Sequence, residues 1–250
     1  MVSEPFKAII LAAGKSKRLG PLTAAVPKCL LKLNGRTILQ HQLESLARNG
    51  IEDITVVTGF CDEAIREHCG SAVHYILNAS YETTNSIYSL WLGLQGVDRG
   101  VIIMNADVVF HPDILSRLIA SPYPDALTVC FGEQLGSEEM KVQVKEHRVV
   151  DISKSMALIN ADGENVGVVK FSRQGRAVLF RMLEKLVSDG VVNAWAPLAF
   201  QKICSFHNIY AVSTDGLPWI EIDFPEDLAK ARNKIYPRIC ADPGARSNTG

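Results

Sequence analysis

The chain has 250 residues, of which 47% are hydrophobic and 21% are charged, and its formal net charge is −1 at pH 7. This near-neutral balance excludes a general electrostatic attraction to nucleic acid or to an anionic membrane surface, so any basic site must be local. The hydrophobic fraction allows a sizeable buried core, and we expect a single domain over residues 1–240.

The first half of the chain alternates short hydrophobic segments with longer amphipathic ones. Strands are expected at 7–13, 53–60, 73–78 and 100–107, and helices at 37–49, 62–69, 85–96 and 112–120. This alternation is typical of βαβ units around a mostly parallel sheet with helices on both faces. Ligands bind beyond the carboxyl ends of such strands, so Gly14, Gly59 and Asp107 are expected to converge there.

Beyond about residue 125 the pattern becomes richer in strands. Strands are expected at 126–132, 140–153, 167–172 and 208–213, and helices at 173–188, 195–204 and 225–235. The segment 141–150 alternates hydrophobic and polar residues, which predicts a small antiparallel excursion at a sheet edge. The overall expectation is a three-layer α/β fold, with residues 241–250 as a disordered tail because they are small and polar.

Six cysteines show neither a C-x-x-C pair nor the spacing of a zinc site, so we expect free thiols in a reducing, cytoplasmic environment. The apolar segment 6–13 is too short to span a membrane and lacks the layout of a signal peptide. No membrane insertion is expected, and a homodimer is compatible with the sequence.

Residues 8–23 read AIILAAGKSKRLGPLT and contain the Gly-Lys-Ser that ends an ATP-binding P-loop. Ile9 stands where that motif needs its first glycine, and Ser16 breaks the dinucleotide motif that would begin at Gly14. What remains is a strand that leads into a loop rich in glycine, lysine and arginine. Exposed amides and fixed cations suit a polyphosphate, although a surface turn with solvated lysines is the alternative interpretation.

Acidic side chains stand at two further strand ends. Asp107 ends one expected strand, and Glu221 and Asp223 lie on the same face of another because their spacing is two. Together these carboxylates could hold one Mg²⁺, with Lys28 beside the loop. The alternatives are a turn cap for Asp107, a solvated lysine at position 28, and a polar strand face for Glu221 and Asp223.

The glycine-rich loop, the lysine and the strand-end carboxylates occur in the order found in a known family. The segments LAAGKSKRLGPLT, PKCLLKLNG, VVTGF, NADVVF and EIDFPEDLAKA resemble the sugar-nucleotidyltransferase superfamily. The segments TTNSIYSLWLGL, EEMKVQV, DISK and DGENVGVVKFS look like its cytidylyltransferases for phosphocholine, 2-aminoethylphosphonate and related compounds. The resemblance implies a Rossmann-like nucleotidyltransferase fold, with CTP and a small phosphorylated or phosphonate acceptor as its partners.

The resemblance also implies roles for individual residues. Arg18 and Lys28 would be the catalytic cations. The nucleotide would be bound by Leu11, Ala12, Ala13, Gly14, Lys28, Asn85, Ser86 and Asp107. Mg²⁺ would be held by Asp107, Asp223 and Glu221. Ser16 departs from the many relatives that have a second glycine there, and Asn85 has the alternative role of a helix N-cap.

The acceptor would be contacted by Lys141, Lys154, Glu164 and Trp195. The alternatives are edge-strand lysines, a solvated turn glutamate and a core tryptophan. The segment 191–200 lacks the acidic residues that relatives often carry, which leaves selectivity for choline or aminoethyl groups open and makes an inositol phosphate a competitor.

The activity implied is a Mg²⁺-dependent transfer of CMP from CTP to the acceptor, with release of pyrophosphate. The nucleophile is already ionised, so no serine, cysteine or histidine base is needed. A sugar-1-phosphate nucleotidyltransferase, an inositol-1-phosphate cytidylyltransferase and a non-catalytic nucleotide-binding regulatory protein are the alternatives.

Overall fold

The computed structural model describes residues 6–132 and 135–241. Its helices are α1 (Ile38–Arg48), α2 (Asp62–Cys69), α3 (Ser86–Gly93), α4 (Pro112–Ala120), α5 (Arg173–Ser188), α6 (Pro197–Ile203), α7 (Pro225–Lys230) and α8 (Tyr236–Ala241). The tail expected at 241–250 begins with the last residue of α8, and its other residues lie outside the described part of the chain.

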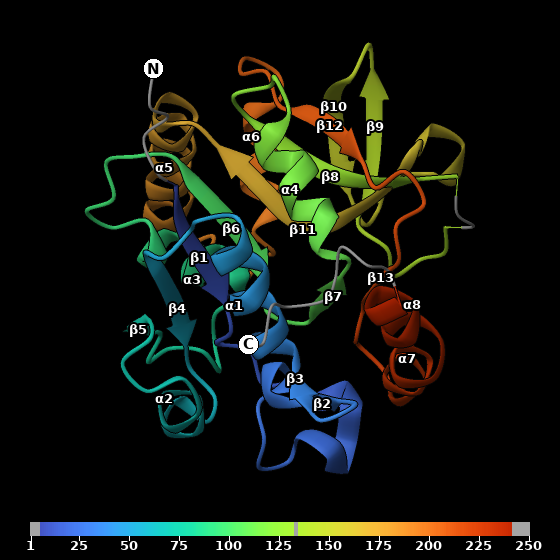
Figure 1. The fold of residues 1–250 in the computed structure, drawn as a ribbon. Helices are drawn as coiled ribbons and strands as arrows, with labels where there is room; N and C mark the ends of the chain where they lie inside the picture. Colours follow the sequence, from blue (N-terminus) through green and yellow to red (C-terminus); the bar gives the residue numbers. More distant parts are fainter. Residues whose placement is uncertain (1–5, 133–134, 242–250) are drawn as a thin grey trace.

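The strands of the central sheet are β1 (Lys7–Leu11), β4 (Ile54–Thr58), β5 (His74–Leu77), β6 (Val101–Asn105), β8 (Ala126–Phe131), β9 (Lys141–Lys145), β10 (Arg148–Ser153), β11 (Gly163–Phe171) and β12 (Tyr210–Ser213). Their order across the sheet is β5-β4-β1-β6-β11-β8-β12-β10-β9. Strands β5, β4, β1 and β6 are parallel, and their arrowheads point toward one edge of the sheet in Figure 1. Strand β11 runs antiparallel to β6 and begins the mixed half of the sheet.

Alternating strand residues enter cores on opposite faces of the sheet. Ile9 of β1 packs into the cluster formed with α3, α5 and α6, whereas Ile10 packs into the cluster formed with α1 and α4. Figure 1 shows α1 and α4 in front of the sheet. Strands buried on both faces explain why the segment AIIL is continuously apolar. The three-layer α/β architecture expected from the sequence is therefore confirmed.

Two very short ladders complete the fold. Strands β2 (Lys32–Leu33) and β3 (Arg36–Thr37) form a hairpin before α1. Strand β13 (Trp219–Glu221) pairs antiparallel with β7 (Val108–Phe110), which directly follows Asp107. The Ile222 amide extends this pairing by donating to the Asp107 carbonyl at 3.1 Å. The ladder brings the C-terminal segment beside the end of β6.

The expected helix at 225–235 is observed as α7 followed by a π-helical turn, Ala231–Ile235, and it continues as α8. Thr37 caps α1 by accepting from the Gln40 amide at 3.0 Å. A proline opens α4, α6 and α7, where the missing N–H costs nothing. The other expected strands and helices are all observed.

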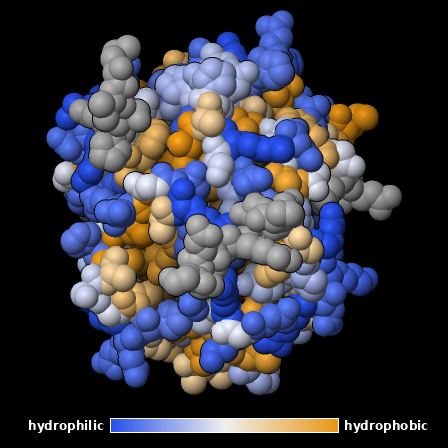
Figure 2. Space-filling model, viewed as in Figure 1, coloured by the Kyte–Doolittle hydropathy of each residue, from blue (hydrophilic) through white to orange (hydrophobic). Residues whose placement is uncertain are grey.

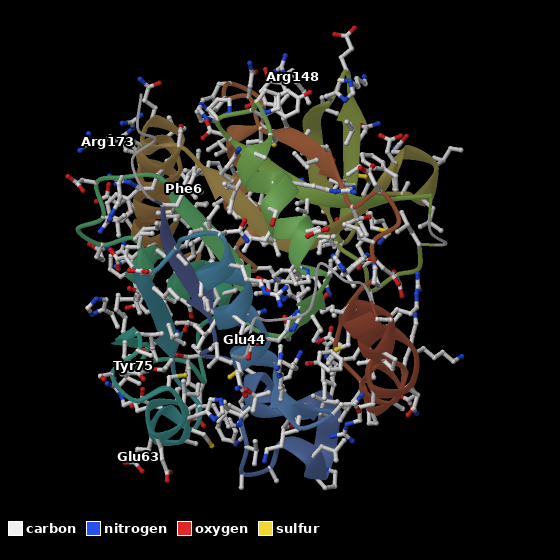
Figure 3. The ribbon with its side chains drawn as sticks, viewed as in Figure 1. Phe6, Glu44, Glu63, Tyr75, Arg148 and Arg173 are labelled. Carbon is white, nitrogen blue, oxygen red and sulfur yellow. The ribbon has the colours of Figure 1, made fainter. Side chains whose placement is uncertain are left out.

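In Figure 3, Phe6 lies at the amino end of β1, on the side where Arg173 begins α5. The site described below lies at the opposite, carboxyl end of β1. On the face seen in Figure 2, hydrophobic residues form small patches between hydrophilic ones. Within residues 6–132 and 135–241, none of the helices combines the length and the apolarity that crossing a bilayer requires.

Candidate active site

A cavity of about 580 Å³ opens at the carboxyl ends of β1 and β6. The expected residues that line it are Leu11, Ala12, Ala13, Gly14, Arg18, Lys28, Asn85, Ser86, Asp107, Lys154, Trp195, Glu221 and Asp223. Ligands of α/β sheets bind beyond the carboxyl ends of the strands, which we call the strand-end rule, and the cavity lies at that place.

The loop after β1 forms one wall, and two backbone hydrogen bonds hold it against β4 and the turn that follows β4. The Ala12 amide donates to the Val57 carbonyl at 2.8 Å, and the Phe60 amide donates to the Ala13 carbonyl at 3.0 Å. Gly59 allows this close approach, because a Cβ there would lie 2.6 Å from the Ala13 carbonyl oxygen. The loop continues into a 3₁₀ helix, Lys17–Thr23, which carries Arg18. The loop thus carries Arg18 into the cavity wall.

Three carboxylates meet opposite this loop. Asp107, Glu221 and Asp223 each offer one oxygen, and these three oxygens lie within 4.8 Å of one another. The Oδ1 oxygen of Asp107 is buried and has no hydrogen-bond partner within the described structure. Mg²⁺ prefers oxygen ligands, and an unsatisfied buried carboxylate oxygen is costly. These residues therefore fit a divalent cation.

Lys28 lies between two of these carboxylates. Its Nζ donates to Asp107 Oδ2 at 2.8 Å and to Asp223 Oδ1 at 2.7 Å, and Arg18 Nη2 lies 2.9 Å from the second oxygen of Asp223. Burial alone would lower the pKa of Lys28, but the charges of Asp107 and Asp223 raise it above its ordinary value. Lys28 therefore stays cationic at neutral pH.

The carboxylates respond to their surroundings in opposite ways. Burial tends to raise the pKa of Asp223, but Lys28 and then Arg18 hold it below its ordinary value. Burial, followed by the charges of Asp107 and Asp223, raises the pKa of Glu221 to about 8. A cation among the three groups would relieve this repulsion.

Asn85 and Ser86 tie helix α3 to the segment that carries Trp195. Asn85 is the N-cap of α3, as the alternative interpretation held, and its Oδ1 accepts from the Ser86 amide at 2.7 Å. Ser86 Oγ accepts from the Ala196 amide at 2.8 Å. Both residues also line the cavity, so capping does not remove them from the site.

The four residues expected at the acceptor separate into two pairs. Lys154 and Trp195 line the cavity, and Lys154 Nζ lies 4.8 Å from the centre of the Trp195 ring. Lys141 and Glu164 do not line it. Lys141 is 2% exposed, and its ammonium donates to the carbonyls of Lys154 at 2.7 Å and of Glu139 at 3.3 Å. This corrects the expectation of a direct contact: Lys141 holds the backbone around Lys154.

Sequence reasoning missed several polar residues of the cavity wall. They are Asn78, Tyr81, Thr84, Ser89, Asn105, Glu138 and Asn165. Asn78 is 1% exposed, and its Nδ2 donates to Thr84 Oγ1 at 3.0 Å and Ser89 Oγ at 3.1 Å. Asn78 follows β5 directly, so the strand-end rule that selected Asp107 could have found it. Glu138 begins the segment EEMKVQV, which carries part of the resemblance, but only Lys141 was selected from it.

Comparison with known proteins identifies the family to which this chain belongs. Residues 8–204 match the MobA-like NTP transferase domain. The chain is 31% identical over 232 residues to choline-phosphate cytidylyltransferase of Streptococcus pneumoniae, which covers 90% of this chain and 96% of that protein. It is 38% identical over 128 residues to CMP-5'-(3-aminopropyl)phosphonate synthase of Streptomyces rubellomurinus, which covers 49% of this chain and only 20% of that longer protein.

The fold agrees with the sequence match. The structure of CTP:phosphocholine cytidylyltransferase from Streptococcus pneumoniae superposes with a TM-score of 0.78 at 23% identity, over 92% of this chain and 98% of that one. The expected Rossmann-like nucleotidyltransferase fold is thereby confirmed. The chain belongs to the MobA-like NTP transferase family, and it is a nucleotidyltransferase.

Proposed function

We propose that the protein is a Mg²⁺-dependent cytidylyltransferase that transfers CMP from CTP to a small phosphorylated or phosphonate acceptor. The observation that carries the proposal is the contact of Lys28 with both Asp107 and Asp223 beside the loop after β1. The relatives named above support the choice of nucleotide, since their names specify a choline-phosphate cytidylyltransferase and a CMP-phosphonate synthase.

In the proposed reaction, an ionised acceptor oxygen forms a bond to the α-phosphorus of CTP. The bond from that phosphorus to the oxygen bridging to the β-phosphate breaks, and pyrophosphate leaves with the electron pair. The main barrier is the approach of two anions, so positioning and charge neutralisation suffice without a protein base.

Each wall of the cavity has a part in this reaction. The amides of the loop after β1 would hold the triphosphate, and Arg18 and Lys28 would offset charge on the transferred and leaving groups. Asp107, Asp223 and Glu221 would hold Mg²⁺, which supplies further positive charge to the phosphates when bound. Asn85 and Ser86 would face the nucleoside, and Lys154 and Trp195 the acceptor.

The test is pyrophosphate release by the purified protein with Mg²⁺ and each of four nucleoside triphosphates. The acceptor panel is phosphocholine, 2-aminoethylphosphonate, inositol 1-phosphate and hexose 1-phosphates. We expect release with CTP and with a phosphorylated or phosphonate acceptor other than a hexose phosphate. Release only with a hexose phosphate and UTP or dTTP would instead assign a sugar-1-phosphate nucleotidyltransferase. Nucleotide binding without turnover would assign a regulatory protein.

A further inference from the structure

Glu138 lies between two cations of the cavity. Its Oε2 accepts a hydrogen bond from Arg18 Nη1 at 3.2 Å and lies 3.8 Å from Lys154 Nζ. Among the described residues that line the cavity, Glu138 is the only carboxylate outside the group of Asp107, Glu221 and Asp223. A protein carboxylate therefore occupies a place between two cations that would suit a phosphate or phosphonate.

A second charged side chain of the protein lies over the face of a neighbouring aromatic ring. The ammonium of Lys154 is 4.8 Å from the centre of the Trp195 ring, and Trp195 is 50% exposed within the cavity wall. The face of an indole ring attracts ammonium groups through its quadrupole. Trp195 thus offers a cation site, which a side chain of the protein fills.

We propose that these two contacts substitute for the two charged ends of a zwitterionic acceptor, and that Glu138 determines specificity for the cationic end. The proposal rests on the proposed function. The acceptor's phosphonate or phosphate takes the place of Glu138 beside Arg18, and the Lys154 ammonium turns from the Trp195 ring toward this anion. Its ammonium takes the place of Lys154 on Trp195 and pairs with the released Glu138 carboxylate. No covalent bond changes in this exchange.

The exposure of these side chains makes the exchange inexpensive. Glu138 is 60% exposed and Arg18 is 45% exposed, and exposed ion pairs contribute little to stability. A doubly charged phosphonate competes well with a single carboxylate for two cations. An acceptor with an ammonium gives Glu138 a new partner, whereas an acceptor with a neutral tail releases it without one. The carboxylate therefore favours the zwitterion.

The experiment compares the wild type with Glu138→Gln, which keeps the shape of the side chain and removes its charge. Glu139→Gln is the matched control, because Glu139 does not line the cavity although its neighbour Glu138 does, and its side chain accepts from the Gly136 amide at 2.7 Å. Pyrophosphate release is measured with CTP and two acceptors of the same shape, 2-aminoethylphosphonate and propylphosphonate. Methylphosphonate, which has no tail, is titrated separately. It measures binding at the anion place alone, which is the position beside Arg18 and Lys154 that Glu138 occupies.

In Glu138→Gln we expect methylphosphonate to bind at least about threefold more tightly, since the competing carboxylate is gone. We expect the preference in kcat/KM for 2-aminoethylphosphonate over propylphosphonate to fall about tenfold, the loss typical of one charged contact. Both values should stay at wild-type level in Glu139→Gln.

Unchanged or weaker methylphosphonate binding in Glu138→Gln overturns the claim that Glu138 occupies the anion place. An unchanged acceptor preference, or an equal change in Glu139→Gln, overturns its role in specificity. If the wild type releases no pyrophosphate with any phosphonate or phosphate, the proposed function fails instead, and the methylphosphonate titration still decides whether Glu138 occupies that place.

Discussion

Lys28 donates a hydrogen bond to Asp223 at 2.7 Å, although 195 positions of sequence separate them. The same ammonium also contacts Asp107, so one lysine connects the loop after β1, the end of β6 and the segment after β13. The contact joins these segments at the cavity, so substitutions in this cluster should lower turnover.

For Lys28→Met we expect kcat to fall by about 10²–10³, the loss typical when one group that stabilises the transition state is removed. Lys28→Arg keeps the charge and should retain part of the activity. The measurement is pyrophosphate release at saturating CTP, with thermal unfolding recorded for each variant. Full activity in Lys28→Met would contradict the assigned role.

For Asp107→Asn we expect more than about 100-fold loss of turnover with little loss of folding, because Asp107 is a candidate ligand with an unpaired buried oxygen. Added Mg²⁺ should also raise the melting temperature of the wild type more than that of this variant, since a ligand of the folded state stabilises it. Asp189→Asn is the control, because Asp189 is exposed and pairs only locally with Lys185. Equal Mg²⁺ shifts in all three proteins would exclude Asp107 as a ligand.

The sequence predicted the site best where function depends on strand ends. Gly14 and Asp107 end hydrophobic segments, and Glu221 and Asp223 share a face by simple alternation, so their convergence follows from the topology of a parallel sheet. The contact between β7 and β13 could not be predicted in the same way. Each strand has only three residues, too few to produce a recognisable period.

The acceptor side was harder to predict because it depends on how the second-half strands pack. Lys141 has the sequence context of an exposed edge lysine, yet pairing of β9 with both β10 and β11 buries it. Glu138 lies in a loop without periodicity, and only the fold brings it to Arg18, which is 120 positions away. Long-range contacts of single side chains leave no trace in local patterns.

Gly59 should control the shape of the nucleotide loop. In Gly59→Ala the new Cβ would meet the Ala13 carbonyl at 2.6 Å and Tyr81 Cβ at 2.8 Å, so the loop must shift. We expect KM for CTP to rise, with a loss of about 1–3 kcal/mol in stability from overpacking. Gly93→Ala is a matched control, since its Cβ would meet Ile9 at 2.8 Å within the core. It should lower stability without a comparable rise in KM, and equal KM values in the two variants would refute a loop-specific effect.

His41 should make stability depend on pH below neutrality. It is 6% exposed, and its Nε2 donates to the Phe110 carbonyl at 2.7 Å. Burial lowers its pKa to about 4, although the bond to Phe110 acts in the opposite direction. Well above pH 6.5, histidine is neutral in both folded and unfolded chains, so its contribution is constant.

Between pH 6.5 and about 4 only the unfolded chain binds the proton at this histidine, so the free energy of unfolding falls as the pH falls. The loss from His41 should reach about 3 kcal/mol at pH 4. Urea unfolding of wild type and His41→Gln across this range measures the effect as a difference in slope, which is independent of any constant loss of stability in the variant. His74→Gln, at an exposed position, should keep the wild-type slope. Identical slopes for wild type and His41→Gln would mean that His41 takes up its proton at an ordinary pKa, and burial would then not control its charge.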